Sequence, residues 1–257
     1  KEVIVVDDGS SDKTWDILKN LGFSLSESRK NTLRYIYKEN GGVSSARNIG
    51  IELSSSEYVA LLDSDDQWKP SKLEAQLSSL KKESFSCRVS HTNEIWIRNG
   101  IRVNQHKKHS KNGGDLFEKC LKMCCISPSS ALIHRTVFND LGGFDESLKA
   151  CEDYDFWLRY CAFEETHFLN EQLTIKNGGH SDQLSQKYWG MDRFRIYSLE
   201  KLLKNKNLSR SKYELALTEL ILKLKILMNG SMKRGKKDFT DELNKKIIHF
   251  ESLLGNE

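Results

Sequence analysis

Three carboxylates follow directly on a short apolar run in the stretch EYVALLDSDDQWKP. The run, residues 58–62, is typical of a buried strand, and Asp63, Asp65 and Asp66 come at its end. In an extended chain Asp63 and Asp65 point to one face, where their charges repel each other unless a cation lies between them. Carboxylate oxygens suit Mg²⁺ or Mn²⁺. The residues predict a divalent-cation site, and the open alternative is a solvated acidic turn before a helix starting near Pro70.

A second acidic pair, Asp7 and Asp8, follows the apolar and β-branched run at residues 2–6. Gly9 allows the chain to turn sharply after this pair. Ligands of open α/β sheets bind outside the carboxyl ends of the strands, where an aspartate can accept hydrogen bonds from a base or a ribose. Ordinary turn chemistry, for which Asp and Gly are common residues, is the open alternative.

A glycine-rich loop, Asn40, Gly41 and Gly42, precedes a helix that the apolar spacing predicts over Val43–Leu53. The first N–H groups of a helix have no partner within the helix and can bind an anion. Arg47 lies about one turn into this helix, where it can contact a phosphate or a base. The loop therefore predicts an anion site near the two acidic strand ends.

Another acidic pair, Glu152 and Asp153, opens the stretch CEDYDFWLRYCAF. An apolar face through Phe156, Trp157 and Tyr160 predicts a helix that begins at this pair. The helix dipole favours carboxylates in the first turn, so a structural role accounts for both residues on the sequence pattern alone.

Successive strand–loop–helix units must position these groups. Three such units in the first part of the chain predict a parallel, doubly wound sheet. Further strands are expected over residues 87–97, 129–134, 166–170 and 173–176, with a helix over 115–125.

The last part of the chain has a helical pattern with two apolar stripes. We expect an α/β domain over residues 1–187 and a helical extension over 188–257, which packs on that domain or on a second subunit. Homodimerisation through these helices and docking on a membrane surface are open alternatives. The basic run KRGKK, residues 233–237, is either solvated surface or a contact with an anionic membrane. The stripes are Leu217, Leu220, Ile221, Leu224 and Leu227, and Leu243, Ile247, Phe250 and Leu254.

Composition narrows the class of protein. The net charge of +4 implies no strong field for nucleic acid, which is not an expected partner. No apolar run approaches the roughly 20 residues that span a bilayer, and no signal peptide opens the sequence. The six cysteines form no CxxC pair, so free thiols in a reducing compartment are expected. These features predict a cytoplasmic protein, with the inner face of the plasma membrane as an open alternative location.

Five blocks in order, VIVVDDGSSDKT, ENGGVSSARNIGI, LLDSDDQWKP, SSALIHRTVFNDLGGFDESL and EDYDFWLR, resemble glycosyltransferase family 2 over residues 2–159. The resemblance implies an α/β chain with the GT-A fold, in which helices flank a Rossmann-like, mostly parallel sheet. It also implies a hexosyltransferase-type enzyme of glycan biosynthesis. Such an enzyme moves a sugar, with inversion, from a nucleotide-diphosphate sugar, here a UDP-sugar, to a saccharide or lipid-linked acceptor.

The resemblance assigns roles at the matching positions. Asp8 is similar to an aspartate that contacts uracil, and Arg47 and Asn48 match a segment that lines the nucleotide pocket. Glu152 and Asp153 match the catalytic pair, in which Asp153 is the general base. A positioned base suits this chemistry, because the pKa of an acceptor hydroxyl lies far above neutrality.

A metal site is implied in the same way. Asp63, Ser64 and Asp65 resemble a DXD motif, in which Asp65 binds Mn²⁺ or Mg²⁺ directly. A divalent ion there neutralises the charge of the departing diphosphate. The segment GGHSDQLS resembles a stretch in which His180 approaches the metal or the diphosphate.

Family members usually begin with one more strand, which lies between those equivalent to residues 2–6 and 57–62. We therefore expect this chain to be a fragment that binds nucleotide sugar poorly and aggregates, because unpaired backbone groups are costly when buried. Two other functions stay open. A nucleotidyltransferase also uses strand-end carboxylates and a metal, and a non-catalytic nucleotide-sugar binding or scaffold protein would use the helical tail for interaction.

Overall fold

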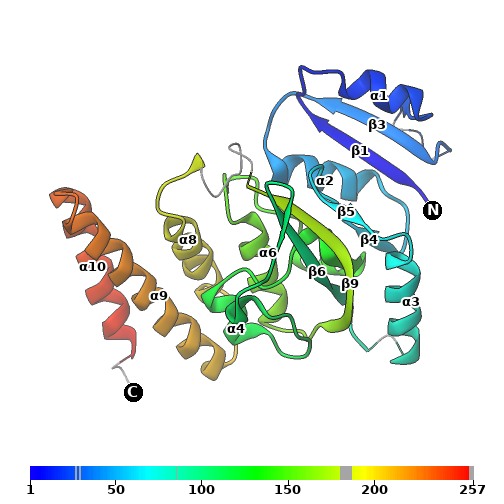
Figure 1. Ribbon diagram of the computed structural model, residues 1–257. Helices are drawn as coiled ribbons and strands as arrows, with labels where there is room; N and C mark the ends of the chain where they lie inside the picture. The colour runs from blue at the N-terminus through cyan, green and yellow to red at the C-terminus, as the bar shows by residue number, and fades with distance from the viewer. Residues whose placement is uncertain (27, 29, 85, 180–186, 255–257) are drawn as a thin grey trace.

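The computed structural model describes residues 1–26, 28, 30–84, 86–179 and 187–254 (Figure 1). The strands are β1 (Val3–Asp8), β2 (Ser24–Leu25), β3 (Leu33–Lys38), β4 (Tyr58–Ala60), β5 (Gln67–Trp68), β6 (Val89–Arg98), β7 (Ile101–Val103), β8 (Ala131–His134) and β9 (His167–Gly178). The helices are α1 (Thr14–Asn20), α2 (Val43–Leu53), α3 (Lys72–Lys82), α4 (Phe117–Lys122), α5 (Thr136–Leu141), α6 (Glu152–Cys161), α8 (Asp192–Leu203), α9 (Arg210–Met232) and α10 (Lys237–Leu254). Short 3₁₀ turns lie at Lys107–His109 and Pro128–Ser130.

The first three strands form a parallel sheet in the order β1-β3-β2. The register places Val3 opposite Leu33 and Asp8 opposite Lys38, and α2 packs against β1. The β-branched run of β1 and the apolar residues of β3 therefore form the strands expected from the sequence. Their carboxyl ends bring Asp8 beside the glycine-rich loop that follows β3.

The third predicted unit does not join this sheet directly, so the parallel sheet expected from the three units is interrupted between β1 and β4. β4 pairs antiparallel with β8, in a second sheet of order β4-β8-β6-β9-β5 with β7 paired to β6. Within this sheet β6 and β9 are parallel, and the other pairs are antiparallel. An apolar run indicates burial but not a partner, because the pairing of a strand depends on contacts with distant parts of the chain. Among the described strands, none pairs with the edge of β1 that faces away from β3.

Two strands expected near residues 166–176 are one long strand, β9. Its pairing with β6 shifts register around Asn93, which accommodates the polar residues between the two apolar runs. This strand matters for the site, because its end at Asn177 contacts the turn that follows β4.

The core surrounds α6, whose aromatic side chains are almost completely buried. Trp157 and Phe156 are inaccessible to solvent, and α4 and α8 pack against the helix. Since α6 is fixed on several sides, its first turn holds Glu152 and Asp153 in a defined place. The six cysteines are all free, as expected.

The C-terminal helices pack on the α/β part of the chain, which is one of the two arrangements predicted for them. Leu217, Leu220 and Leu224 of α9 are buried, and α9 contacts both α4 and α8. α10 packs along α9 through Leu243 and Ile247 (Figure 1). The domain boundary at residues 187 and 188 and the homodimer stay predictions. Within the part of the chain that the structure describes, no helix combines the length and apolar character needed to cross a bilayer.

Candidate active site

The guanidinium group of Arg47 joins two of the acidic clusters. Its Nη2 lies 2.6 Å from Asp63 Oδ1 and its Nη1 lies 2.8 Å from Glu152 Oε1. The side chain is only 10% exposed and lies over the Phe144 ring, 5.2 Å from its centroid. Burial opposes the charge of Arg47, but Asp63 and Glu152 raise its pKa overall. The first half of α2, the turn that follows β4 and the start of α6 therefore meet at one place.

Glu152 differs from Asp153 in its surroundings. Burial raises the pKa of Glu152, and the neighbouring charge of Asp153 adds to this, while Arg47 opposes both. Because Arg47 also donates a hydrogen bond to Glu152, the Glu152 carboxylate is held inside the site.

Asp153 is half-buried, and two donors orient its carboxylate. The backbone N–H of Tyr154 donates to Oδ1 at 2.7 Å, and Cys124 Sγ donates to Oδ2 at 3.1 Å. Burial and the charge of Asp153 hold the pKa of Cys124 well above its ordinary value, so the thiol keeps its proton and can donate it to this bond. The role of Cys124 could not be read from the sequence, where it is one more cysteine beside an apolar helix.

The acidic turn after β4 presents its carboxylates differently. Asp65 and Ser64 are exposed, whereas Asp66 is buried, and burial raises the pKa of Asp66 to about 6. Asn177 fixes this turn: its Nδ2 donates to Asp65 O at 2.6 Å, and its N–H donates to Asp66 Oδ1 at 3.1 Å. The N–H of Asp63 donates to Ser129 Oγ at 3.1 Å. Asn177 and Ser129 were not predicted, because both are remote from the turn in sequence.

The acidic turn is the place where the residues predict a metal site. Among the described residues no three His, Cys, Asp or Glu side chains come together in a way that would hold an ion. The Asp65 carboxylate makes no side-chain hydrogen bond within the described chain and is available to solvent. His180, expected from the resemblance to approach the metal, lies outside the described residues.

The Asp8 carboxylate binds the glycine-rich loop directly. It accepts hydrogen bonds from the N–H groups of Gly41 and Gly42, both at 2.8 Å, and pairs with Lys38 at 2.5 Å. Burial opposes ionisation of Asp8, but these bonds, led by that of Lys38, lower its pKa overall. In this structure the N–H groups that the sequence assigns to an anion are thus bound to Asp8.

The turn at the end of β1 needs its glycine. Gly9 has a φ of +85°, and a Cβ at this position would lie 3.0 Å from the backbone nitrogen of Asn40. The side chain of Asn40 donates to Asp8 O at 2.8 Å. Asp7 is buried and accepts from Tyr35 Oη at 2.5 Å and from Ser10 N at 2.7 Å, which is the turn role left open for it.

Asn48 fastens a loop to α2. Its Oδ1 accepts from Phe144 N at 2.8 Å, and its Nδ2 donates to Phe144 O at 2.9 Å and to Glu146 Oε1 at 2.8 Å. These bonds place Phe144 against Arg47. The amide of Asn48 is therefore occupied, and its expected contact with a nucleotide stays a prediction.

Known proteins are similar to this chain in sequence. A sequence profile described as glycosyl transferase family 2 matches residues 1–142. An uncharacterised glycosyltransferase of Rickettsia typhi is 34% identical over 186 residues, covering 71% of this chain and 56% of the relative. The Escherichia coli enzyme named UDP-Glc:alpha-D-GlcNAc-diphosphoundecaprenol beta-1,3-glucosyltransferase WfgD is 34% identical over 157 residues, covering 61% of this chain and 56% of that enzyme. The chain thus spans little more than half the length of these relatives.

Solved structures show the same fold. Staphylococcus aureus TarS, residues 1–349 in complex with UDP-GlcNAc, superposes with a TM-score of 0.65 at 21% identity, covering 87% of this chain and 62% of that one. This likeness confirms the expected α/β GT-A fold class. The profile match extends over more than half of the chain, and the protein therefore belongs to glycosyl transferase family 2.

Proposed function

We propose that this protein transfers a sugar, with inversion, from a nucleotide-diphosphate sugar to a saccharide or lipid-linked acceptor. The observation that carries the proposal is the Arg47 bridge, which brings the turn bearing Asp63 and Asp65 to the start of α6. A UDP-sugar is the donor that we propose, since TarS is described in complexes with UDP-GlcNAc and UDP. The name of WfgD, a glucosyltransferase acting on a diphosphoundecaprenol-linked sugar, supports a lipid-linked acceptor.

Asp153 is proposed as the general base that takes the proton of the acceptor hydroxyl. It is half-buried, and its two oxygens are oriented by Tyr154 N–H and by the Cys124 thiol. A positioned base is needed because the hydroxyl ionises far above neutral pH. Glu152 is bound to Arg47, so its proposed role is to hold the α6 end of the site in place.

The donor set at the acidic turn fits a divalent cation. Asp65 offers exposed oxygen atoms, and Mg²⁺ or Mn²⁺ is commonly held by one or two carboxylates together with substrate phosphates. Asp65 and Asp63 would hold the ion, with Ser64 between them and His180 as the further candidate that the resemblance suggests. A bound ion would neutralise the charge of the departing diphosphate. Arg47 holds Asp63 and adds positive charge beside it.

The nucleotide is proposed to bind at the carboxyl end of β1. Asp8, Gly9 and the loop Asn40, Gly41 and Gly42 form this wall, with Asp8 facing the base. Asp7 stabilises the turn by accepting hydrogen bonds from Tyr35 and Ser10. The negative charge of Asp8 is already balanced by Lys38, so this wall can accept a neutral base without leaving a buried charge unpaired.

The experiment is a donor panel of nucleotide sugars with Mg²⁺ or Mn²⁺ and a lipid-linked acceptor. Asp153→Asn should keep donor affinity and lose transfer by about 10²-fold or more, the usual scale for a general base. Asp65→Asn should weaken Mn²⁺-dependent donor binding in calorimetry. Glu171→Gln, an exposed acid on β9, is the matched control and should change neither quantity.

Each alternative function has its own result. Release of pyrophosphate from a nucleoside triphosphate would make the protein a nucleotidyltransferase. Donor binding with no turnover on any acceptor would make it a nucleotide-sugar binding protein. Wild-type turnover in Asp153→Asn would return this residue to a helix-capping role.

A further inference from the structure

The densest basic run of the chain forms the turn between α9 and α10. α9 ends at Met232 and α10 begins at Lys237, so Lys233, Arg234 and Lys236 lie on the connection. All four basic side chains of the run are exposed. Lys233 and Lys237 make no side-chain hydrogen bond or ion pair within the described chain, so both charges face solvent uncompensated.

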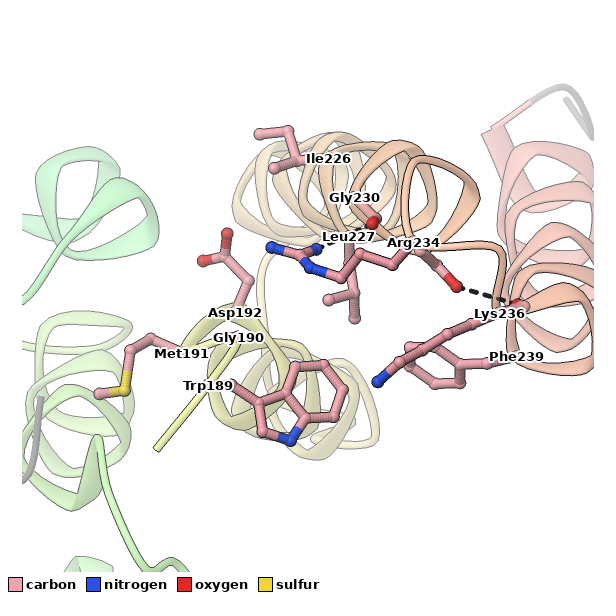
Figure 2. Close-up of a pocket in the computed structure, with 11 residues that line it drawn as sticks. Trp189, Gly190, Met191, Asp192, Ile226, Leu227, Gly230, Arg234, Lys236 and Phe239 are labelled. Carbon is pink, nitrogen blue, oxygen red and sulfur yellow. Dashed lines mark hydrogen bonds between the residues drawn. The ribbon is translucent and has the colours of Figure 1, made fainter. Parts of the chain in front are cut away.

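An apolar hollow lies beside this turn. It has a volume of about 370 Å³ and is lined by Trp189, Ile226 and Phe239, and also by Arg234 and Lys236 (Figure 2). Trp189 is 51% exposed and Ile226 is 52% exposed. Large apolar side chains that are exposed together are unusual on the surface of a soluble protein. Such a patch indicates a site of contact with a partner or a membrane.

Basic groups surround the Trp189 indole. The Arg193 guanidinium lies 3.7 Å from the ring centroid and the Lys236 ammonium 4.3 Å from it. These cation–π contacts hold the indole at the surface. Asp192, an acidic residue of the lining, is bound to Arg195 at 2.9 Å, so it does not cancel the positive charge of Arg234 and Lys236.

We propose that this α9–α10 patch, formed by Trp189, Ile226, Lys233, Arg234, Lys236 and Lys237, docks on the surface of an anionic phospholipid bilayer. Charge complementarity decides the occupant, because lysine and arginine beside exposed apolar groups match phosphate headgroups above acyl chains. Tryptophan favours this boundary, since its ring is apolar and its N–H can remain hydrated. The proposal concerns binding and goes beyond the proposed transfer reaction.

The patch lies next to the start of α6. Met191, which lines the hollow, accepts a hydrogen bond at its carbonyl from Cys151 Sγ at 3.9 Å, and Cys151 directly precedes Glu152. Docking would therefore hold the acidic end of the site close to the bilayer, where the head of a lipid-linked acceptor is found. This consequence rests on the proposed function, whereas membrane binding can be measured without any turnover.

Vesicle co-sedimentation tests the proposal directly. The protein should sediment with vesicles that contain phosphatidylglycerol and should not sediment with vesicles of phosphatidylcholine alone. Added salt should weaken its binding to the anionic vesicles. Lys233→Gln with Lys237→Gln should lower the partition coefficient about 25-fold, because each basic residue at an anionic surface contributes about fivefold. Lys204→Gln with Lys206→Gln is the matched control, since this exposed pair lies between α8 and α9, at the opposite end of α9.

A second measurement reports the depth of Trp189. Brominated phospholipid should quench tryptophan emission of the bound protein, and Trp189→Phe should abolish the quenching while keeping most of the binding. Equal binding by the two lysine double variants would overturn the proposal, as would equal binding to phosphatidylcholine. Displacement from vesicles by soluble diphosphate at constant ionic strength would instead identify a small-anion pocket. Lipid-independent dimers abolished by Trp189→Ala would identify a second copy of the chain as the occupant.

Discussion

At the scale of single residues, the hydrogen bond from Cys124 to Asp153 gives the clearest prediction. Cys124→Ala removes the donor at 3.1 Å that orients the proposed base. We expect kcat to fall about fivefold, which corresponds to one hydrogen bond of about 1 kcal/mol. The KM for the nucleotide sugar should stay unchanged. Cys124→Ser keeps a donor at this position and should restore most of kcat.

The control for this prediction is Cys87→Ala, a half-buried cysteine that makes no contact with the acidic groups of the site. Each variant should also unfold thermally at a midpoint close to that of the wild type, so that a change in kcat does not come from lost stability. If Cys124→Ser were as slow as Cys124→Ala, the thiol would have only a packing role.

Lys72 gives a prediction about pH. Its side chain is fully buried, bonded to Gln76 Oε1 at 2.8 Å, and burial lowers its pKa to about 7 from 10.5. Between these two pH values the unfolded chain binds a proton that the folded chain has lost, so this group makes stability rise with pH. In Lys72→Met the free energy of unfolding, measured with urea at pH about 7 and about 10, should lack this rise. Lys69→Met, an exposed neighbour, should keep the wild-type slope.

At the scale of elements, the contact between α2 and the loop before α6 depends on a glycine. A Cβ at Gly143 would lie 2.3 Å from Asn48 Oδ1, closer than atoms can approach. Gly143→Ala should therefore displace the Asn48 amide, break its bonds to Phe144 and cost about 1 to 3 kcal/mol in the free energy of unfolding. The same change in an Asn48→Ala background should cost much less, because the space is then vacant.

A double-mutant cycle in urea measures this coupling. Additive costs of the two substitutions would show that the Asn48 bonds do not hold the loop. Loss of the contact should also lower transfer, since Phe144 supports the Arg47 guanidinium that joins Asp63 to Glu152.

At the scale of the whole molecule, the C-terminal helices share the core of the α/β part. Leu224 of α9 is inaccessible to solvent and belongs to the cluster that includes Trp157 of α6. Leu224→Ala should lower the free energy of unfolding by about 2 to 5 kcal/mol in a single transition. Leu222→Ala, whose side chain is 50% exposed, should change it by less than about 0.5 kcal/mol. An early separate transition for α9 and α10 would show instead an independent helical unit.

The amino-acid sequence by itself determined where several of the strands and helices lie along the chain. The β-branched run at residues 2–6 predicts a strand, and β1 lies there and extends through Asp7 and Asp8. The apolar run at residues 58–62 also predicts a strand, of which β4 occupies the first three residues, so that Leu61 and Leu62 separate the strand from Asp63. Likewise, the helical spacing after Gly42 predicts α2, which the structure confirms. These features are local, because the alternation or spacing of side chains along a short segment decides which of its faces can be buried.

Only the tertiary structure decided which of these segments meet. β4 pairs with β8 rather than with the parallel sheet, and Arg47 contacts Glu152, a residue 105 positions away. The bonds of Asn177 to the acidic turn and of Cys124 to Asp153 arise in the same way. Such contacts depend on the packing of whole elements around α6, where many buried surfaces compete for partners, and no short stretch of sequence carries that information.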